Sequence, residues 1–459
     1  MTRTVLPPIL AAGVILAAAP VAPAAATIPA FARRYHTSCS TCHTAAPKLN
    51  VLGEAFRLNG YRFPENDLLL RKEESVPLGE DPWKELWPRA IWPGEIPGTV
   101  PLAIRLQNDV GLTRLSTGGS QFAFNFPHEV YLLAGASLGD QIAAFLESEW
   151  TKEDGLEVVQ AKVEFQDPVS GLPERLLNVW VGMQNLYLTT FADRQIDRAG
   201  RQSFHWQEFA VSDLPVRGPG GVLLDPSENE FRLEGTQPAM ELNGLAVSRF
   251  AWAVGVGQGT SEGAEDNNDR KDLYYRVRYK LGGLGLDGSY RASEGPPQGG
   301  GGQLRDRSVT LEHFGYLGGE PAAAGITDDH SAFGVVARVL FGPLDVGGGY
   351  VWGRNSDPWG FGTGALHWGS VHAKAEYLVY PWLITSLKAE HFTLDRPPAS
   401  PAGSPLPGDQ DRIIPGVIAL IRQNVRAVVE ADLYLHDERS SALGEPTPAA
   451  LWVRLDVAF

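Results

Sequence analysis

From about residue 98 to the last residue, apolar and polar side chains alternate with a period of two. In the segment 425–436, valine, alanine and leucine occupy one face, whereas Arg426 and Glu430 lie on the other. Alternation of this kind predicts β-strands with one apolar face and one strongly polar face. The same pattern recurs in the segments 371–380 and 273–280.

A soluble sandwich of two sheets also has alternating strands, so further features must separate it from a membrane barrel. The predicted strands are about 10 residues long, as a tilted strand must be to cross a bilayer. Short turns at one end of the strands and long polar loops at the other are typical of outer-membrane barrels. Tight turns are predicted at 138–140, 281–283 and 380–382, and long loops at 192–230, 258–271, 395–410 and 437–447.

The C-terminal residues provide a third feature. Val453, Leu455 and Phe459 fall on one face of a final strand, and Arg454 and Asp456 fall on the other. A last strand that ends on an aromatic residue resembles the insertion signal of outer-membrane barrels. The pattern therefore favours a membrane barrel over a soluble sandwich.

Residues 98–459 are thus predicted to form an all-β, transmembrane antiparallel barrel. About 17 strand-like runs are present, and a single-chain bacterial barrel needs an even number. We expect 16 strands, with 18 as the alternative. A barrel of this size leaves an aqueous lumen, which the polar faces would line.

The histidines of the barrel segment are expected to be part of that lining. His372, His391 and His436 are predicted to face the lumen. His367 and His372 are five residues apart on one predicted strand, hence on opposite faces, and do not make a metal pair. The sequence contains no recognisable hydrolase triad, phosphate loop or carboxylate pair, and we predict no catalytic residue.

Residues 1–26 have the layout of a secretory signal. Arg3 precedes an apolar run that ends in small residues at Ala24-Ala25-Ala26, and prolines interrupt the run, which disfavours a membrane anchor. Removal of the signal would take the formal charge from -15 to -16, because Arg3 is its only charged residue. An acidic chain is a poor partner for nucleic acid. We expect export to the outer membrane of a Gram-negative bacterium, in contact with its lipid.

The chain contains two cysteines, in the sequence Cys39-Ser-Thr-Cys42-His43. This spacing is the attachment signature of c-type haem, in which both thiols form thioethers and the histidine ligates the iron. A redox disulfide would be expected within a βαβ pattern, and a zinc site would need two further ligands at short spacing. Neither context is present, so one covalent haem c is predicted, held by Cys39, Cys42 and His43.

A helix is predicted directly after this motif. Pro47 suits a first helical position, Leu49, Leu52 and Phe56 share one helical face, and Gly60 is a candidate C-terminal cap. The apolar face of this helix would pack on the haem or on another apolar surface.

The second axial ligand of the haem is not evident. Met183 and Met240 lie far along the chain, and His36, three residues before Cys39, is a weak candidate for the opposite face. The distal ligand therefore stays unknown. Residues 27–97, the haem segment and a linker, are the right size for a plug in the barrel. Three tryptophans of this segment are candidates for packing against haem or barrel: Trp83, Trp87 and Trp92.

The haem region resembles the fused monohaem cytochrome–porins of bacterial outer membranes. The resemblance covers about 30 residues and lies in a block of short motifs: Pro29-x-Phe31-Ala32-Arg33, Cys39-x-x-Cys42-His43, Pro47-x-Leu49-Asn50, Gly53, Phe56-Arg57 and Gly60-Tyr61. Tyr35-His36 and Leu52 depart from the family pattern.

The resemblance implies a haem segment that plugs or caps a barrel of about 16 strands. It also implies an electron-transfer protein, with oxidation of extracellular ferrous iron, Fe(II), as a candidate activity and periplasmic electron-transfer proteins as acceptors. The acidic segment 261–269 is a candidate for attracting the iron. The alternatives are a solute porin whose haem plug gates the pore or senses redox state, and a soluble periplasmic cytochrome with a β-sandwich domain.

Overall fold

In a computed structural model of the chain, most of the residues after position 29 can be described. Residues 1–26 of the predicted signal, the three tryptophans at 83, 87 and 92, and residues 261–268 of the acidic segment lie outside the described residues. Those described are 30–77, 95–98, 100–114, 119–152, 155–189, 196, 216–217, 223–224, 233, 236–259, 269–289, 306–322, 326–357, 364–395, 409–437 and 449–459.

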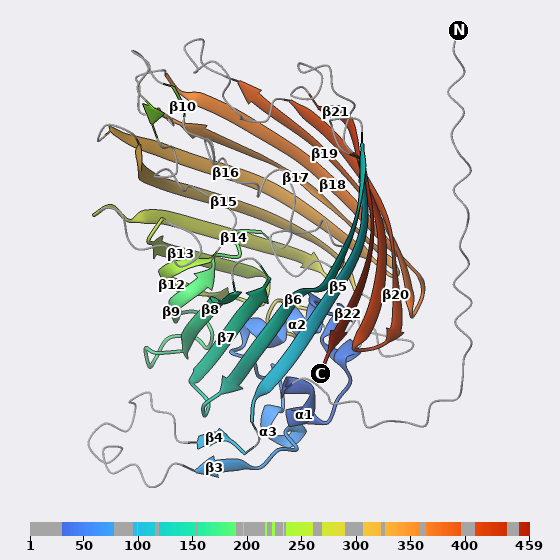
Figure 1. The fold of residues 1–459 in the computed structure, drawn as a ribbon. Coiled ribbons are helices and arrows are strands. Elements are labelled where there is room, and N and C mark those ends of the chain that lie inside the picture. The colour runs from blue at the N-terminus through green and yellow to red at the C-terminus, as the bar shows by residue number, and fades with distance from the viewer. Residues whose placement is uncertain are drawn as a thin grey trace, which may run out of the picture.

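Sixteen antiparallel strands close into a barrel, in agreement with the predicted number. Consecutive strands pair with each other around the sheet, β9 pairs with β12, and β22 closes the ring on β5 (Figure 1). The strands are β5 (Leu102–Arg114), β6 (Ser120–Ser137), β7 (Ile142–Thr151), β8 (Gly155–Gln166), β9 (Asn178–Asn185), β12 (Thr236–Ala246), β13 (Phe250–Gly257), β14 (Asp272–Gly282), β15 (Arg307–Ala322), β16 (Ile326–Phe341), β17 (Leu344–Asn355), β18 (Leu366–Tyr380), β19 (Leu383–Asp395), β20 (Gln410–Arg422), β21 (Val425–Asp437) and β22 (Ala449–Ala458). A separate two-stranded sheet joins β10 (Val216–Arg217) and β11 (Leu223–Leu224).

The predicted final strand is the one that closes the barrel. β22 pairs with β5 from Ala449 to Ala458, and the backbones of Phe459 and Ile104 exchange hydrogen bonds of 2.7 and 2.8 Å. The last residue therefore continues the ladder, as expected from its alternation. No strand edge is left open in this sheet, and closure of this kind is what allows strands to cross a bilayer.

The barrel is apolar on the outside, and its interior holds many polar and charged side chains beside buried apolar clusters. On β21, Val429 is 44 % exposed while its neighbours Val428 and Glu430 are buried. The lumen-facing charges predicted on β18 and β21 are buried too, among them Lys374, Glu376 and Arg426. A soluble sandwich would place its apolar residues inside. This reversed arrangement is the one expected of a barrel surrounded by lipid.

Connection lengths distinguish the two ends of the barrel. At the end where the three N-terminal helices and the C-terminus lie (Figure 1), five connections are short and two are longer. The short ones are 138–141, 247–249, 342–343, 381–382 and 423–424, and the longer ones are 167–177 and 283–306. At the opposite end the connections include 186–235, 258–271, 396–409 and 438–448. The tight turns predicted at 138–140 and 380–382 are confirmed. The one predicted at 281–283 is wrong, because β14 ends at Gly282 and the chain reaches β15 only at Arg307.

Aromatic side chains surround the outer face at the short-turn end. Such girdles mark the level where the bilayer meets water. The exposed residues are Tyr279, Phe341, Tyr377, Tyr380, Trp382 and Phe459. In the described residues no helix has the length and apolar character needed to cross a membrane.

Two of the three histidines expected in the lumen lie elsewhere. His372 is buried in the interior as predicted, but His391 is exposed on the outer face and contacts Asp411. A register shift between β20 and β21 pairs Asp411 with His436 and Arg412 with Tyr434. The extra residue at this bulge moves His436 to the outer face, where it is exposed.

The N-terminal segment folds at the short-turn mouth of the barrel. It contains α1 (Ala30–Tyr35), a 3-10 turn (Cys39–Thr41), β1 (His43–Ala45), β2 (Lys48–Leu49), α2 (Val51–Leu58), α3 (Asp67–Leu70), β3 (Ser75–Pro77) and β4 (Glu95–Pro97). The helix predicted to begin near Pro47 begins at Val51 instead, because Asn50 caps it and Leu49 belongs to β2. Gly60, with φ of 63°, follows the C-cap residue Asn59, as predicted.

Replacing Val429 by arginine tests which face of the barrel meets lipid. We expect a loss of about 2–4 kcal/mol in the free energy of unfolding, because a guanidinium near mid-membrane must leave water. The same change at Leu435, near the long-loop rim, should cost about 1 kcal/mol or less. Urea unfolding in lipid vesicles, followed by tryptophan fluorescence, measures both values. Equal losses would contradict the membrane placement.

Candidate functional site between the N-terminal segment and the barrel wall

A cavity of about 230 Å³ lies between the N-terminal segment and the barrel wall. This volume suits an organic group rather than one or two water molecules. From the N-terminal segment its lining includes Cys39, Cys42, His43, Phe56 and Tyr61, and from the barrel it includes Ala103, Arg105, Tyr131 and Phe145. The three residues that the sequence predicted as haem ligands thus meet at one mainly apolar cavity.

The two cysteines lie on a single tight turn. The Cys42 amide donates to the carbonyl of Cys39 over 3.2 Å, which closes the turn and brings both side chains to the same cavity. The thiols are not joined by a disulfide bond. Within the described residues, no cluster of three or more histidine, cysteine or acidic side chains could hold a metal ion. In the described residues, the geometry therefore adds no support for a redox disulfide or for a zinc site at this motif.

Burial changes the chemistry of both thiols. It raises the pKa of Cys42 to about 12, with a smaller contribution from Cys39, and raises the pKa of Cys39 as well. The raised pKa values disfavour the thiolate form of both side chains.

Asn50 holds the turn against α2. Its side-chain oxygen accepts hydrogen bonds from the amides of Leu52 and Gly53 at 3.0 and 2.9 Å, which caps the helix. Its side-chain nitrogen donates to the carbonyls of Ser40 and Thr41 at 3.2 and 3.0 Å. One side chain thus fixes both the helix start and the loop between the cysteines.

Gly53 allows the helix to approach this loop closely. A Cβ atom at this position would lie 2.0 Å from the carbonyl oxygen of Cys42. That distance is far inside van der Waals contact with backbone that cannot move aside. The absence of a side chain at Gly53 is therefore a requirement of the site.

His43 is oriented by the backbone. Its Nδ1 lies 3.1 Å from the carbonyl oxygen of Pro47. Because a carbonyl can only accept, Nδ1 carries the proton, and Nε2 has the lone pair that can ligate a metal. A second-sphere hydrogen bond of this kind is typical of histidines that bind metals.

Aromatic rings connect the N-terminal segment to the barrel. Phe31 stacks on Tyr61 with ring centroids 5.1 Å apart, and Tyr61 stacks on Phe145 of β7 at 5.7 Å. Phe56 lies edge-on to Phe31 at 5.3 Å. These rings form the apolar side of the cavity and exclude water from it.

Ion pairs hold the N-terminal segment in the mouth of the barrel. Lys48 Nζ lies 2.6 Å from Asp345 and 2.5 Å from Glu376, and all three side chains are largely buried. Arg62 pairs with Asp140 at 3.5 Å, where the carboxylate is exposed. The segment is therefore attached on two sides, by a buried cluster and by a surface pair.

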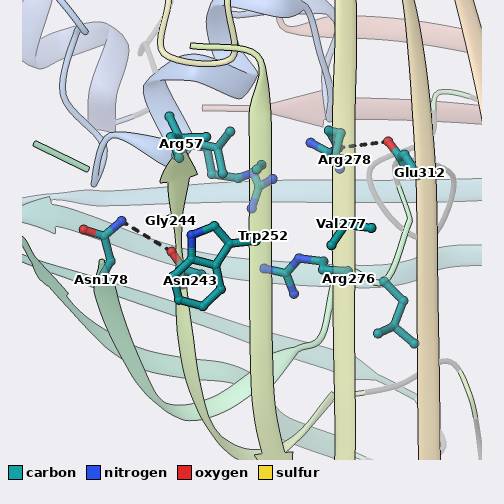
Figure 2. Close-up of a pocket in the computed structure, with 13 residues that line it drawn as sticks. Arg57, Asn178, Asn243, Gly244, Trp252, Arg276, Val277, Arg278 and Glu312 are labelled. Atoms are coloured by element: carbon teal, nitrogen blue, oxygen red, sulfur yellow. Dashed lines mark hydrogen bonds and ion pairs between the residues drawn. The ribbon is translucent and has the colours of Figure 1, made fainter. Parts of the chain in front are cut away.

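A second pocket lies deeper in the lumen and is much smaller, about 30 Å³. Figure 2 shows Arg57 of α2 at about the same level as Arg278 of β14, with Arg276 of β14 lower on the wall. Both wall arginines have carboxylate partners, Arg276 with Glu241 at 2.7 Å and Arg278 with Glu312 at 2.9 Å. This volume holds no more than a few waters, so we do not treat the pocket as a ligand site.

The sequence did not identify a distal ligand, and the candidates it named are not in the cavity. His36 is exposed and is absent from the lining, and Met240 lies on the outer face. The lining contributed by described residues holds no methionine and no histidine besides His43.

Sequence reasoning missed the barrel half of the lining. Those residues belong to alternating strands, and nothing local distinguishes them from other lumen positions.

No family model and no curated protein matches this chain. The solved structures similar to it include the outer membrane channel DcaP of Acinetobacter baumannii, with a TM-score of 0.53 and 11% identity, over 78% of this chain and 97% of that one. They also include an anion-selective porin from Comamonas acidovorans, with a TM-score of 0.48 and 12% identity, over 79% and 99%. The chain shares the fold of Gram-negative outer-membrane porins.

Proposed function

We propose that this chain is an outer-membrane cytochrome of the fused cytochrome–porin type, with one haem c bound at Cys39, Cys42 and His43. The observation that carries the proposal is the convergence of these three residues on one apolar cavity. The thiols share one turn, His43 presents Nε2, and the remaining lining is largely apolar or aromatic. This set of donors fits a covalent haem.

A bound haem would supply a centre that takes up and releases single electrons. The residues of the chain would hold and tune that centre. Cys39 and Cys42 would attach it, and the bond from His43 to Pro47 would orient the axial imidazole. Phe56, Tyr61 and Phe145 would keep water away, which affects the reduction potential.

The fold supports a periplasmic position for the haem site. Bacterial barrels have short turns on the periplasmic side and long loops outside, and the cavity lies at the short-turn end. A periplasmic electron-transfer protein could therefore approach directly. A tilted strand of about 13 residues spans roughly 30 Å, so an extracellular donor such as Fe(II) would have to enter the lumen to come near the haem.

A solute porin with a redox-sensing plug is the second candidate. The observation in its favour is the polar lumen above the haem segment, with charges such as Arg278 and Lys388 in cross-strand or neighbouring ion pairs. In that case the haem segment would control passage, and solute flux would change with the haem's redox state.

Electron transfer into liposomes separates the two candidates. Purified protein is inserted into vesicles that enclose a soluble cytochrome, and ferrous iron or another impermeant reductant is added outside. The cytochrome function predicts reduction of the enclosed protein, and a Cys39→Ala/Cys42→Ala variant in the same vesicles should not support it. Rapid solute-driven swelling of the vesicles, with reduction of the enclosed cytochrome that the Cys39→Ala/Cys42→Ala variant supports equally, would instead identify a porin.

A further inference from the structure

Two cationic side chains reach the haem cavity, Arg57 from α2 and Arg105 from β5. Arg57 is directed toward the lumen: its guanidinium pairs with Glu54 at 3.0 Å and lies over the ring of Tyr187 at 4.7 Å. It also lines the smaller lumen pocket. Arg105 is therefore the stronger candidate for a charged contact with a group in the cavity.

The surroundings of Arg105 fix its position. Its Nε and Nη2 reach the carboxylate of Asp456 on β22 at 2.9 and 2.6 Å, and its guanidinium lies 5.1 Å from the ring centroid of Tyr131. Only 11 % of the side chain is exposed. A guanidinium held on a carboxylate and an aromatic face has a fixed orientation, so little rotamer freedom is lost when a ligand contacts it.

The carboxylate that holds Arg105 is shared. Arg426 of β21 also donates to Asp456, at 3.2 and 2.8 Å. Two guanidinium groups and one carboxylate carry a net positive charge in this trio. Glu147, the acidic residue of the lining, accepts a hydrogen bond from Gln160 at 3.0 Å on the neighbouring strand. Glu129 on β6 accepts a hydrogen bond from the Tyr131 hydroxyl at 2.6 Å. The excess positive charge is therefore confined to the Arg105–Asp456–Arg426 trio, and an anionic group would bind there.

We propose that Arg105 binds a propionate carboxylate of the haem, and that Asp456 and Arg426 position Arg105 for this contact. The inference rests on the proposed haem c, whose two propionates are its anionic groups. Arginine is the side chain best matched to a carboxylate, because its planar fork can donate two parallel hydrogen bonds. The barrel wall would then be a functional part of the haem site and not only its container.

The contact would set the reduction potential. Reduction adds a negative charge to the haem, so a cation bound to its propionate stabilises the reduced form more than the oxidised form. Removing the cation should therefore lower the potential. We expect at least a threefold to tenfold change in the redox equilibrium constant, where tenfold corresponds to 59 mV for one electron.

The test compares Arg105→Leu with Arg454→Leu in the full-length, haem-loaded protein. Arg454 is a matched control, because it pairs with Asp109 across the same two strands but does not line the cavity. Redox titration gives the potential, and resonance Raman spectroscopy reports the bending modes of the propionates, which a merely structural role would not move. We expect Arg105→Leu to lower the potential and shift the propionate mode, and Arg454→Leu to change neither by a comparable amount.

A second variant keeps the proposal testable if Arg105→Leu does not fold. Asp456→Asn keeps Arg105 but removes the carboxylate that positions it, and should shift the propionate mode as Arg105→Leu does. Haem-loaded variants with the wild-type potential and propionate mode would overturn this inference alone. Wild-type protein that carries no covalent haem would instead overturn the proposed function.

Discussion

Replacing Cys39 and Cys42 together by alanine should abolish covalent haem while leaving the barrel folded. Both side chains line the cavity and neither is part of the barrel sheet. Thioethers to these thiols are the only covalent attachment that the proposal provides. After denaturing electrophoresis, the wild-type band should therefore show haem peroxidase stain and the variant band should show none.

Folding of the variant is checked by the shift in electrophoretic mobility that a closed barrel shows before and after boiling. A matched control is Ser40→Ala, which changes the same turn without touching either thiol. Stain that survives in the double variant would place the haem elsewhere, and loss of the mobility shift would show that the cysteines support the fold.

Replacing Lys48 by methionine should release the haem segment from the barrel mouth. The change removes two short charge-assisted hydrogen bonds in a buried setting, to Asp345 and Glu376. Such bonds contribute about 1.5–3 kcal/mol each. Arg338 and Lys374 still pair with the two carboxylates, so we expect a loss of about 2–3 kcal/mol in docking free energy rather than collapse of the barrel.

Hydrogen exchange of residues 39–58 measures this release, and conductance in planar bilayers measures its effect on the lumen. Faster exchange and larger or more frequent openings are expected for Lys48→Met. Arg62→Met is the control, because its partner Asp140 is exposed and a surface pair contributes only about 0–1 kcal/mol. Equal effects of the two substitutions would show that the buried cluster does not anchor the segment.

The barrel could be predicted because its lumen and its surface impose opposite polarities on alternate residues. On β18 the buried residues His372, Lys374 and Glu376 alternate with outward positions, as the sequence indicated. The prediction of inward and outward faces was wrong where the inner face of a strand is itself apolar. Phe392 and Leu394 belong to a buried apolar cluster inside the barrel, so polarity could not show that His391, which directly precedes Phe392, faces outward.

The Cys39-x-x-Cys42-His43 motif could be recognised because its spacing is local, and the haem it predicts stays a prediction. The environment of the motif could not be recognised, because contacts such as Arg105 with Asp456 join residues 351 positions apart. The predicted start of α2 was wrong because two nearby residues, Pro47 and Asn50, both favour a helix start. Pro47 is a good first helical residue, but Asn50 makes a complete N-cap and binds the cysteine loop at the same time.

The central claim is that one haem is covalently bound at Cys39 and Cys42 of a folded outer-membrane barrel. The most direct measurement is the intact mass of the protein purified from outer membranes, followed by mass spectrometry of the peptide that contains residues 39–43. The account predicts a mass increase of one haem, located on that peptide through both cysteines. A mature protein of unmodified mass, with two titratable thiols, would contradict it.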